Sequence, residues 1–236
     1  MRLDELFTNL GVVAGTIATQ LREATAGVPL DELDLTGPAP REVALAGPAQ
    51  VILSDGEVLR IDVDAAPGSE EVRFVLHDGY LRVAGGEADT TVRVTLPTPR
   101  KLAIAGSGRM SAARLARDGE VSVAGSGRLE IEHADGGDLG INIAGSGRLM
   151  LNGRAERLDL SIAGSGSCDG EGLTVENAQV SIAGSGDAIF RCDGEVEASL
   201  MGSGDVIVRG SARCSVHSMG SGSLVCERTR EADQAH

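Results

Sequence analysis

Apolar and polar residues alternate on both sides of a Gly-Ser-Gly motif that recurs through the second half of the chain. Around its second copy, Val121 and Val123 precede the motif, and Leu129 and Ile131 follow it. A period of two is typical of a β-strand that buries one face. Each copy therefore predicts two strands joined by a glycine corner.

The motif recurs at a nearly constant spacing. Its steps are 19, 20, 19, 20, 18 and 18 residues, from starts at Gly106, Gly125, Gly145, Gly164, Gly184, Gly202 and Gly220. A fixed period of about 20 residues indicates a solenoid. One such unit cannot bury its inner face alone, but stacked copies share a continuous core. The pattern predicts an all-β fold, a β-solenoid with coils of about 19 residues.

Glycine suits the corners because it reaches positive φ without a Cβ clash. The predicted structural corners are Gly106, Gly108, Gly125, Gly127, Gly145, Gly147, Gly164, Gly166, Gly184, Gly186, Gly202, Gly204, Gly220 and Gly222. A second interpretation is a row of backbone amides that bind anions. That role requires basic neighbours, and only Arg109, Arg128 and Arg148 supply them directly after a corner. The structural interpretation is therefore favoured.

Residues 1–25 differ from the rest of the chain. Their apolar side chains recur every three or four residues, at Leu3, Leu6, Phe7, Leu10, Val13, Ala14, Ile17 and Leu21. This spacing predicts an amphipathic helix. We expect the helix to cap the solenoid, with oligomerisation or interfacial membrane attachment as alternatives. Interrupting polar residues and glycines argue against a secretory signal and a membrane span.

The rest of the chain is expected to form one β-solenoid domain over residues 41–227. A Gly- and Pro-rich linker over 26–40 precedes it, and a polar tail over 228–236 follows it. Within the domain, 41–100 is the irregular first part and 101–227 the regular repeats. Gly47 marks a degenerate corner, with apolar residues at the same offsets as in later coils. The pairs Asp55-Gly56 and Asp78-Gly79 predict hairpin turns.

Composition narrows the classes of partner. The 236 residues are 42% apolar, which is enough for a real core. Aromatic residues make up only 2%, which disfavours stacking platforms for bases or sugar rings. The net charge of −14 argues against nucleic acid or an anionic membrane as the main partner. No cofactor is predicted.

The four cysteines fall on inward-facing positions of the predicted strands, at Cys168, Cys192, Cys214 and Cys226. Their spacing matches no zinc pattern. No two of them share a column in adjacent coils. We therefore expect them to act as small buried hydrophobes, without a disulfide ladder.

Asp187 and Asp205 are the best candidates for chemistry, because they occupy one column of adjacent coils. Two carboxylates about 5 Å apart could hold a cation or shift one another's pKa. The simpler interpretation is a solvated pair at a corner. They are a weak metal candidate, and no catalytic residue is predicted.

Another column lies three residues before each corner and is expected to face outward. It is small and rich in hydroxyls, at Ser122, Asn142, Ser161, Ser181 and Ser199. We refer to these five residues as the polar strip. It could bind a partner strand, a glycan or a second copy of the chain. The alternative is plain surface.

Several segments together resemble a known family. The sequences DGYLRV and VRVTLPTPRKLAIAGSG, followed by repeated SIAGSG and GSGDVIV units, resemble the auto-transporter adhesin head GIN domain family. The resemblance covers roughly residues 40–227. It implies a right-handed β-helix-like fold, an extracytoplasmic envelope setting, and an adhesion role without recognised catalytic residues.

The resulting hypothesis is a non-enzymatic structural or interaction module of the adhesin-head type. In it, a rigid rod presents polar columns to a protein or glycan surface. One alternative is a cytoplasmic self-assembling scaffold of the bactofilin kind, with homo-oligomerisation through residues 1–25 or the solenoid ends. A solenoid carbohydrate-active enzyme that uses Asp187 and Asp205 is less favoured.

Overall fold

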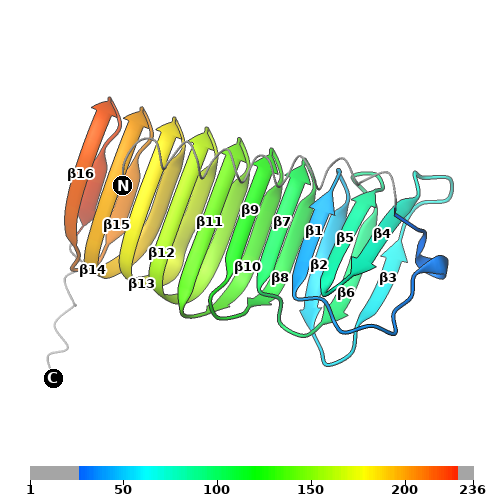
Figure 1. Ribbon diagram of the computed structural model, residues 1–236. Coiled ribbons are helices and arrows are strands. Elements are labelled where there is room, and N and C mark those ends of the chain that lie inside the picture. Colours follow the sequence, from blue (N-terminus) through cyan, green and yellow to red (C-terminus); the bar gives the residue numbers. More distant parts are fainter. Residues whose placement is uncertain (1–26, 228–236) are drawn as a thin grey trace, which may run out of the picture.

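The computed structural model describes residues 27–227, which form an all-β solenoid (Figure 1). The predicted fold class is thereby confirmed. The helical content of these residues is one 3-10 turn, η2 (Leu30–Glu32). The helix predicted over residues 1–25 lies outside the described residues, as does the tail after residue 227.

The strands form two faces. The first face holds the strands that lead into the corners. In spatial order they are β4 (Val72–His77), β5 (Tyr80–Gly85), β1 (Glu42–Ala46), β7 (Lys101–Gly106), β9 (Glu120–Gly125), β11 (Asp138–Gly145), the second halves of β12 (Arg148–Gly164), β13 (Ser167–Gly184) and β14 (Asp187–Gly202), and β16 (Arg213–Gly220).

The second face holds the strands that follow the corners. In spatial order they are β3 (Arg60–Asp64), β6 (Thr91–Leu96), β2 (Gln50–Asp55), β8 (Arg109–Leu115), β10 (Arg128–Asp135), the first halves of β12, β13 and β14, β15 (Val206–Arg209) and β17 (Leu224–Glu227). Neighbouring strands run parallel, except for the pairs β4–β5 and β3–β6.

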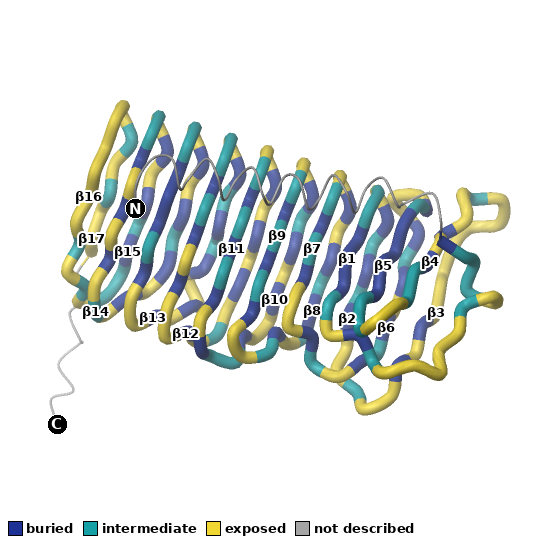
Figure 2. Tube along the Cα trace, viewed as in Figure 1, coloured by how far each residue is buried: buried dark blue, intermediate teal, exposed yellow. Residues whose placement is uncertain are grey.

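Equivalent residues of successive coils stack in register. Ile141, for example, pairs with Val121 on one side and Leu160 on the other. The inward column that contains it is at most 2% exposed, over Leu102, Val121, Ile141, Leu160, Val180 and Ala198. Figure 2 shows buried positions running through the stacked coils. These aliphatic side chains belong to one continuous buried cluster, which forms the narrow interior of the solenoid.

Two antiparallel strands close the N-terminal end of the stack. β4 joins β5 through a hairpin in which Asp78 and Gly79 have φ of 46° and 79°, so the prediction for this turn is confirmed. The hairpin predicted at Asp55-Gly56 is wrong. β2 and the following β3 do not pair, because β6 lies between them and pairs with both.

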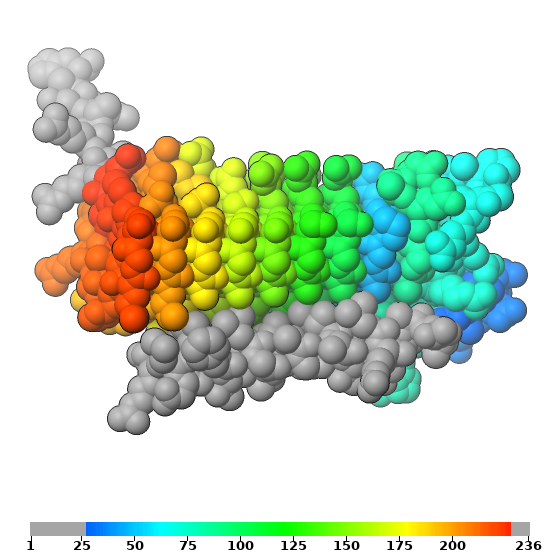
Figure 3. Space-filling model, turned by 90° about the horizontal axis from the view of Figure 1, so that it is seen from above, coloured from blue at the N-terminus to red at the C-terminus, as the bar shows by residue number. Residues whose placement is uncertain are grey.

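The first coil in sequence is not the first in space. The β1–β2 coil lies between the β5–β6 coil and the β7–β8 coil, as the blue band among green ones shows in Figure 3. The chain passes from β6 to β7 beside Arg41, whose carbonyl accepts hydrogen bonds from the amides of Arg100 and Lys101 at 2.7 and 3.1 Å. Gly47 forms the corner of this coil with φ of 132°, as its degenerate motif predicted.

Candidate functional site

The Gly-Ser-Gly corners are the most repeated surface feature. Gly145 has φ of 111°, in a region that side chains rarely adopt. A Cβ on Gly145 would also lie 2.5 Å from the carbonyl oxygen of Gly125 in the previous coil. The serine between the two glycines is exposed, so each corner presents a hydroxyl to solvent while its glycines allow close stacking.

The corner amides are largely used within the stack. The amide of Ser146 donates to the Gly125 carbonyl at 2.8 Å, and that of Arg148 donates to the Gly127 carbonyl at 3.0 Å. The same bonds recur in later coils. Because these N–H groups already have partners, an anion at a corner would depend on side chains.

Three arginines supply such side chains on one part of the corner edge. Arg109, Arg128 and Arg148 are register neighbours on β8, β10 and β12. Together with the serines and glycines of their corners they line a polar hollow of about 200 Å³. We call it the arginine groove, with lining residues Ser107, Gly108, Arg109, Ser126, Gly127, Arg128, Ser146 and Arg148.

The positive charge of the arginine groove is not neutralised by ion pairs within residues 27–227. Like charges at adjacent strand positions repel, and within residues 27–227 none of the three arginines forms an ion pair. Arg114, on the same strand as Arg109, pairs with Asp135 at 2.6 Å. The buried Nε of Arg128 has no hydrogen-bond partner in the described part of the chain. The groove can therefore accept an anionic group.

Asp187 and Asp205 occupy the same corner column further along the rod. An Oδ1 atom of Asp187 accepts a hydrogen bond from the amide of Asp205 at 3.1 Å. Asp205 in turn accepts from the amide and hydroxyl of Ser223 at 3.0 and 2.6 Å. Each carboxylate thus satisfies a backbone donor of the next coil. Among residues 27–227 there is no group of three or more His, Cys, Asp or Glu side chains that could hold a metal ion.

The polar strip lies on the outer side of the first face, as its alternation predicted. Its members are not equally accessible, however. Ser199 is exposed and Ser122, Asn142 and Ser161 are intermediate, whereas Ser181 is buried, with only 5% of its surface exposed.

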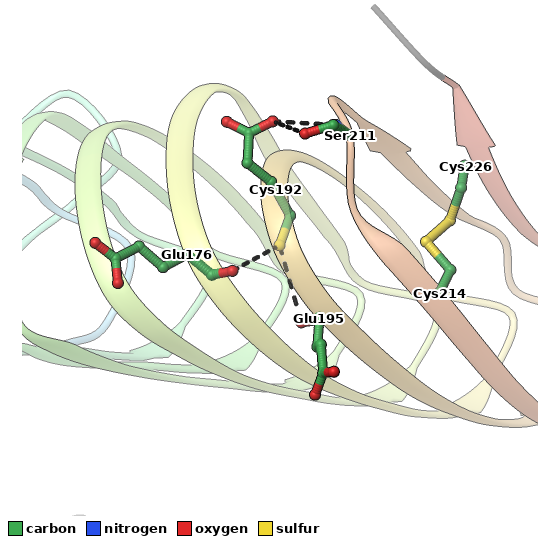
Figure 4. Close-up of a disulfide and its surroundings, with 7 residues drawn as sticks. Glu176, Cys192, Glu195, Ser211, Cys214 and Cys226 are labelled. Atoms are coloured by element: carbon green, nitrogen blue, oxygen red, sulfur yellow. Dashed lines mark hydrogen bonds between the residues drawn. A yellow bond between two sulfur atoms is a disulfide. The ribbon is translucent and has the colours of Figure 1, made fainter.

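Two of the cysteines form a disulfide, which corrects the expectation that all four act as buried hydrophobes. Cys214 on β16 and Cys226 on β17 are bonded, with their Cα atoms 6.7 Å apart (Figure 4). They lie six residues before and six residues after Gly220, so they face each other across one coil. This symmetry about one corner is not visible when only equivalent columns of adjacent coils are compared.

Cys168 and Cys192 remain free and buried. Burial, with a smaller contribution from Asp169, raises the pKa of the Cys168 thiol to about 12. Burial also raises the pKa of Cys192, whose thiol donates to the Glu176 carbonyl at 3.3 Å. Thiols with raised pKa values are poor nucleophiles, so neither cysteine suits covalent catalysis.

The disulfide is expected to hold the coil of β16 and β17, the last one among the described residues, whose side chains are more exposed than those of earlier coils. Val216 and Val225 on its two strands are 45% and 43% exposed. Replacing Cys214 and Cys226 by serine should destabilise β16 and β17 by about 2–4 kcal/mol and leave β7–β11 unchanged, as measured by hydrogen exchange. In the wild type, alkylation after denaturation should label two thiols without reductant and four with it. Four labelled thiols in both cases would contradict the pairing.

No helix within residues 27–227 is long and apolar enough to cross a membrane.

Comparison with known proteins places this architecture in a family. The model of the family described as "Putative auto-transporter adhesin, head GIN domain" matches residues 39–212. The chain belongs to the GIN domain family. The family resemblance seen in the repeats is therefore confirmed. Comparison with curated proteins found no match.

Solved structures share the fold of this GIN domain. A "putative adhesin" from Bacteroides fragilis has a TM-score of 0.68 at 16% identity, over 80% of this chain and 92% of that chain. A "putative adhesin" from Parabacteroides merdae has a TM-score of 0.61 at 17% identity, over 82% and 94%. A "Putative lipid binding protein" from Parabacteroides distasonis has a TM-score of 0.60 at 18% identity, over 81% and 94%.

Proposed function

We propose that this GIN domain is a non-enzymatic interaction module that binds anionic groups of a partner surface through its arginine groove. The observation that carries the proposal is three stacked arginines without ion pairs in a protein of net charge −14. Guanidinium groups recognise carboxylate, sulfate and phosphate oxygens with directed hydrogen bonds. Serine hydroxyls of the same corners add neutral donors and acceptors.

The stacking of coils suits this role. Equivalent side chains of neighbouring coils repeat at about 4.8 Å, so the groove offers charges at a fixed spacing. A partner that carries several anionic groups, such as a sulfated or carboxylated glycan, can contact more than one coil at once. Contacts of modest strength then add up through multivalency.

An enzymatic role receives no comparable support. The carboxylates of Asp187 and Asp205 each accept a hydrogen bond from a backbone amide of the next coil, which is a structural role. The histidines near other carboxylates, His77 and His133, are exposed and lie on other parts of the rod.

The disulfide supports an extracytoplasmic setting, because disulfides persist in oxidising compartments. The family's adhesin description points to the same location. The thiol count described above can test this proposal when cells are alkylated before lysis. Four reactive thiols in protein trapped in the cells would argue for a reducing compartment.

Binding can be tested with a sulfated polysaccharide such as heparin as the probe and neutral dextran as the control. A variant carrying Arg109→Gln, Arg128→Gln and Arg148→Gln should bind heparin at least about tenfold more weakly, because each exposed contact contributes about 0.2–1 kcal/mol. Higher salt should weaken wild-type binding in the same direction.

A matched variant removes the same charge elsewhere. Arg60, Arg154 and Arg213 are exposed and lie outside the groove, so their replacement by glutamine should leave heparin binding within about twofold of wild type. Equal losses in both triple variants would show that only net charge matters. Binding of dextran as tight as that of heparin would also reject the anionic partner.

A further inference from the structure

The outer side of the first face carries two neighbouring columns of small residues. The column directly before the corners is alanine over seven successive strands, at Ala84, Ala46, Ala105, Ala124, Ala144, Ala163 and Ala183 in spatial order. The polar strip and Ala44 and Ala103 form the second column. We call both columns together the small-residue face.

The second face of the rod is different. Its outer column five residues after each corner contains Ser111, Glu130, Met150, Asp169 and Ile189, which vary in size and charge. The first face also carries a charged outer column farther from the corners, which includes Lys101, Glu120 and Asp159, so only its two columns nearest the corners are small and uncharged. The small-residue face therefore has a geometry suited to close packing of another element.

Burial on this face supports a covering element. Ala44, Ala84 and Ser181 point away from the solenoid interior, yet they are only 6%, 7% and 5% exposed. Arg82, in the same column as Ala44, is 3% exposed. Within residues 27–227, each strand of this face has its neighbours at its edges, and η2 lies against β4. Ala84 has the longer side chain of Arg73 on β4 as its register neighbour, whereas Ser181 has only serines, Ser161 and Ser199. The burial of Ser181 therefore points to a further covering element.

We propose that residues 1–25 form the covering element, as a helix laid lengthwise along the small-residue face. The apolar stripe predicted from Leu3 to Leu21 provides the surface that would contact it. The flat alanine column lets a helix approach the sheet closely. Packing against the sheet also supplies the tertiary contacts that stabilise an isolated amphipathic helix.

Chain length and direction agree with this arrangement. Val28 pairs with Phe74 on β4, the edge strand of the same face, so residue 27 begins at one end of the small-residue face. A helix of 25 residues extends about 37 Å. The seven steps between β5 and β14 span about 34 Å. One helix therefore matches the length of the face, whereas a cap over the solenoid end would leave the face open.

Hydrogen exchange of the full chain tests the proposal. Amides of residues 3–21 should be protected by at least about 100-fold relative to an unfolded peptide, independently of protein concentration. Replacing Ala124, Ala144 and Ala163 by glutamate should abolish that protection. Glutamate at Ser111, Met150 and Ile189 on the opposite face provides the matched control, which should retain it. Protection in β7–β14 should persist in both variants.

A second variant avoids changes to the sheet. Leu6→Ser, Leu10→Ser and Ile17→Ser should also expose residues 3–21 to exchange, and should speed tryptic cleavage after Arg22 by at least about tenfold. Unprotected amides in the wild type, or protection unaffected by the alanine-to-glutamate changes, would overturn the proposal. Protection lost on dilution would assign the segment to a second copy. Protection gained only on adding phosphatidylglycerol vesicles would assign it to a membrane, and either outcome overturns intrachain docking.

Discussion

Replacing Gly145 and Gly164 together by valine is expected to unfold the central coils. These glycines have φ of 111° and 116°, and a strained backbone of this kind costs about 1–3 kcal/mol per residue. A Cβ on Gly164 would also lie 2.5 Å from the Gly145 carbonyl oxygen. Neither backbone can yield without separating two coils. The combined cost is comparable with a typical total stability of about 5–15 kcal/mol.

The measurement is thermal unfolding followed by circular dichroism, with hydrogen exchange to locate the damage. Each coil contacts only its neighbours, so protection should be lost first around β11–β13. Ser146→Val with Ser165→Val is the control, because it places the same side chains at the adjacent exposed positions. The control should melt close to wild type. A glycine double variant with an unchanged melting curve would contradict the role of the corners in stacking.

The regular coils could be predicted because each one repeats the same local sequence pattern. Alternating apolar residues define the inward columns, and glycine pairs mark the corners, so local pattern and tertiary register agree. The same logic recovered the corner at Gly47, although its sequence is degenerate. Register in a solenoid follows from this agreement, since a shift by one residue would expose every inward side chain.

The N-terminal end could not be predicted in the same way. Residues between Gly47 and Gly106 contain alternating strands, but alternation does not say which strands pair. At Asp55-Gly56, a local turn signal was overridden because β6 inserts between β2 and β3. The resulting antiparallel strands β3 and β4 cover an end that would otherwise expose parallel strand edges.

The candidate sites, too, could be predicted only in part from the sequence. The sequence identified the arginine column and the outward polar strip, because both follow from counting residues from each corner. It could not show that the carboxylates of Asp187 and Asp205 hold amides of the next coil, since that depends on side-chain conformation. Nor could it show that Ser181 is buried, because burial of an outer face depends on what packs over it.

Phe190→Ala is expected to destabilise the domain by about 3–5 kcal/mol. Phe190 is 1% exposed inside the solenoid and lies in register beside Gly170, where a Cβ would stand 3.5 Å from that of Phe190. The small residue makes room for the large one, so the Gly170 side offers no side chain to fill the cavity. Ile189→Ala removes a half-buried outer side chain and should cost less than about 1 kcal/mol. Urea unfolding measures both, and equal losses would show that Phe190 is not part of a tightly packed interior.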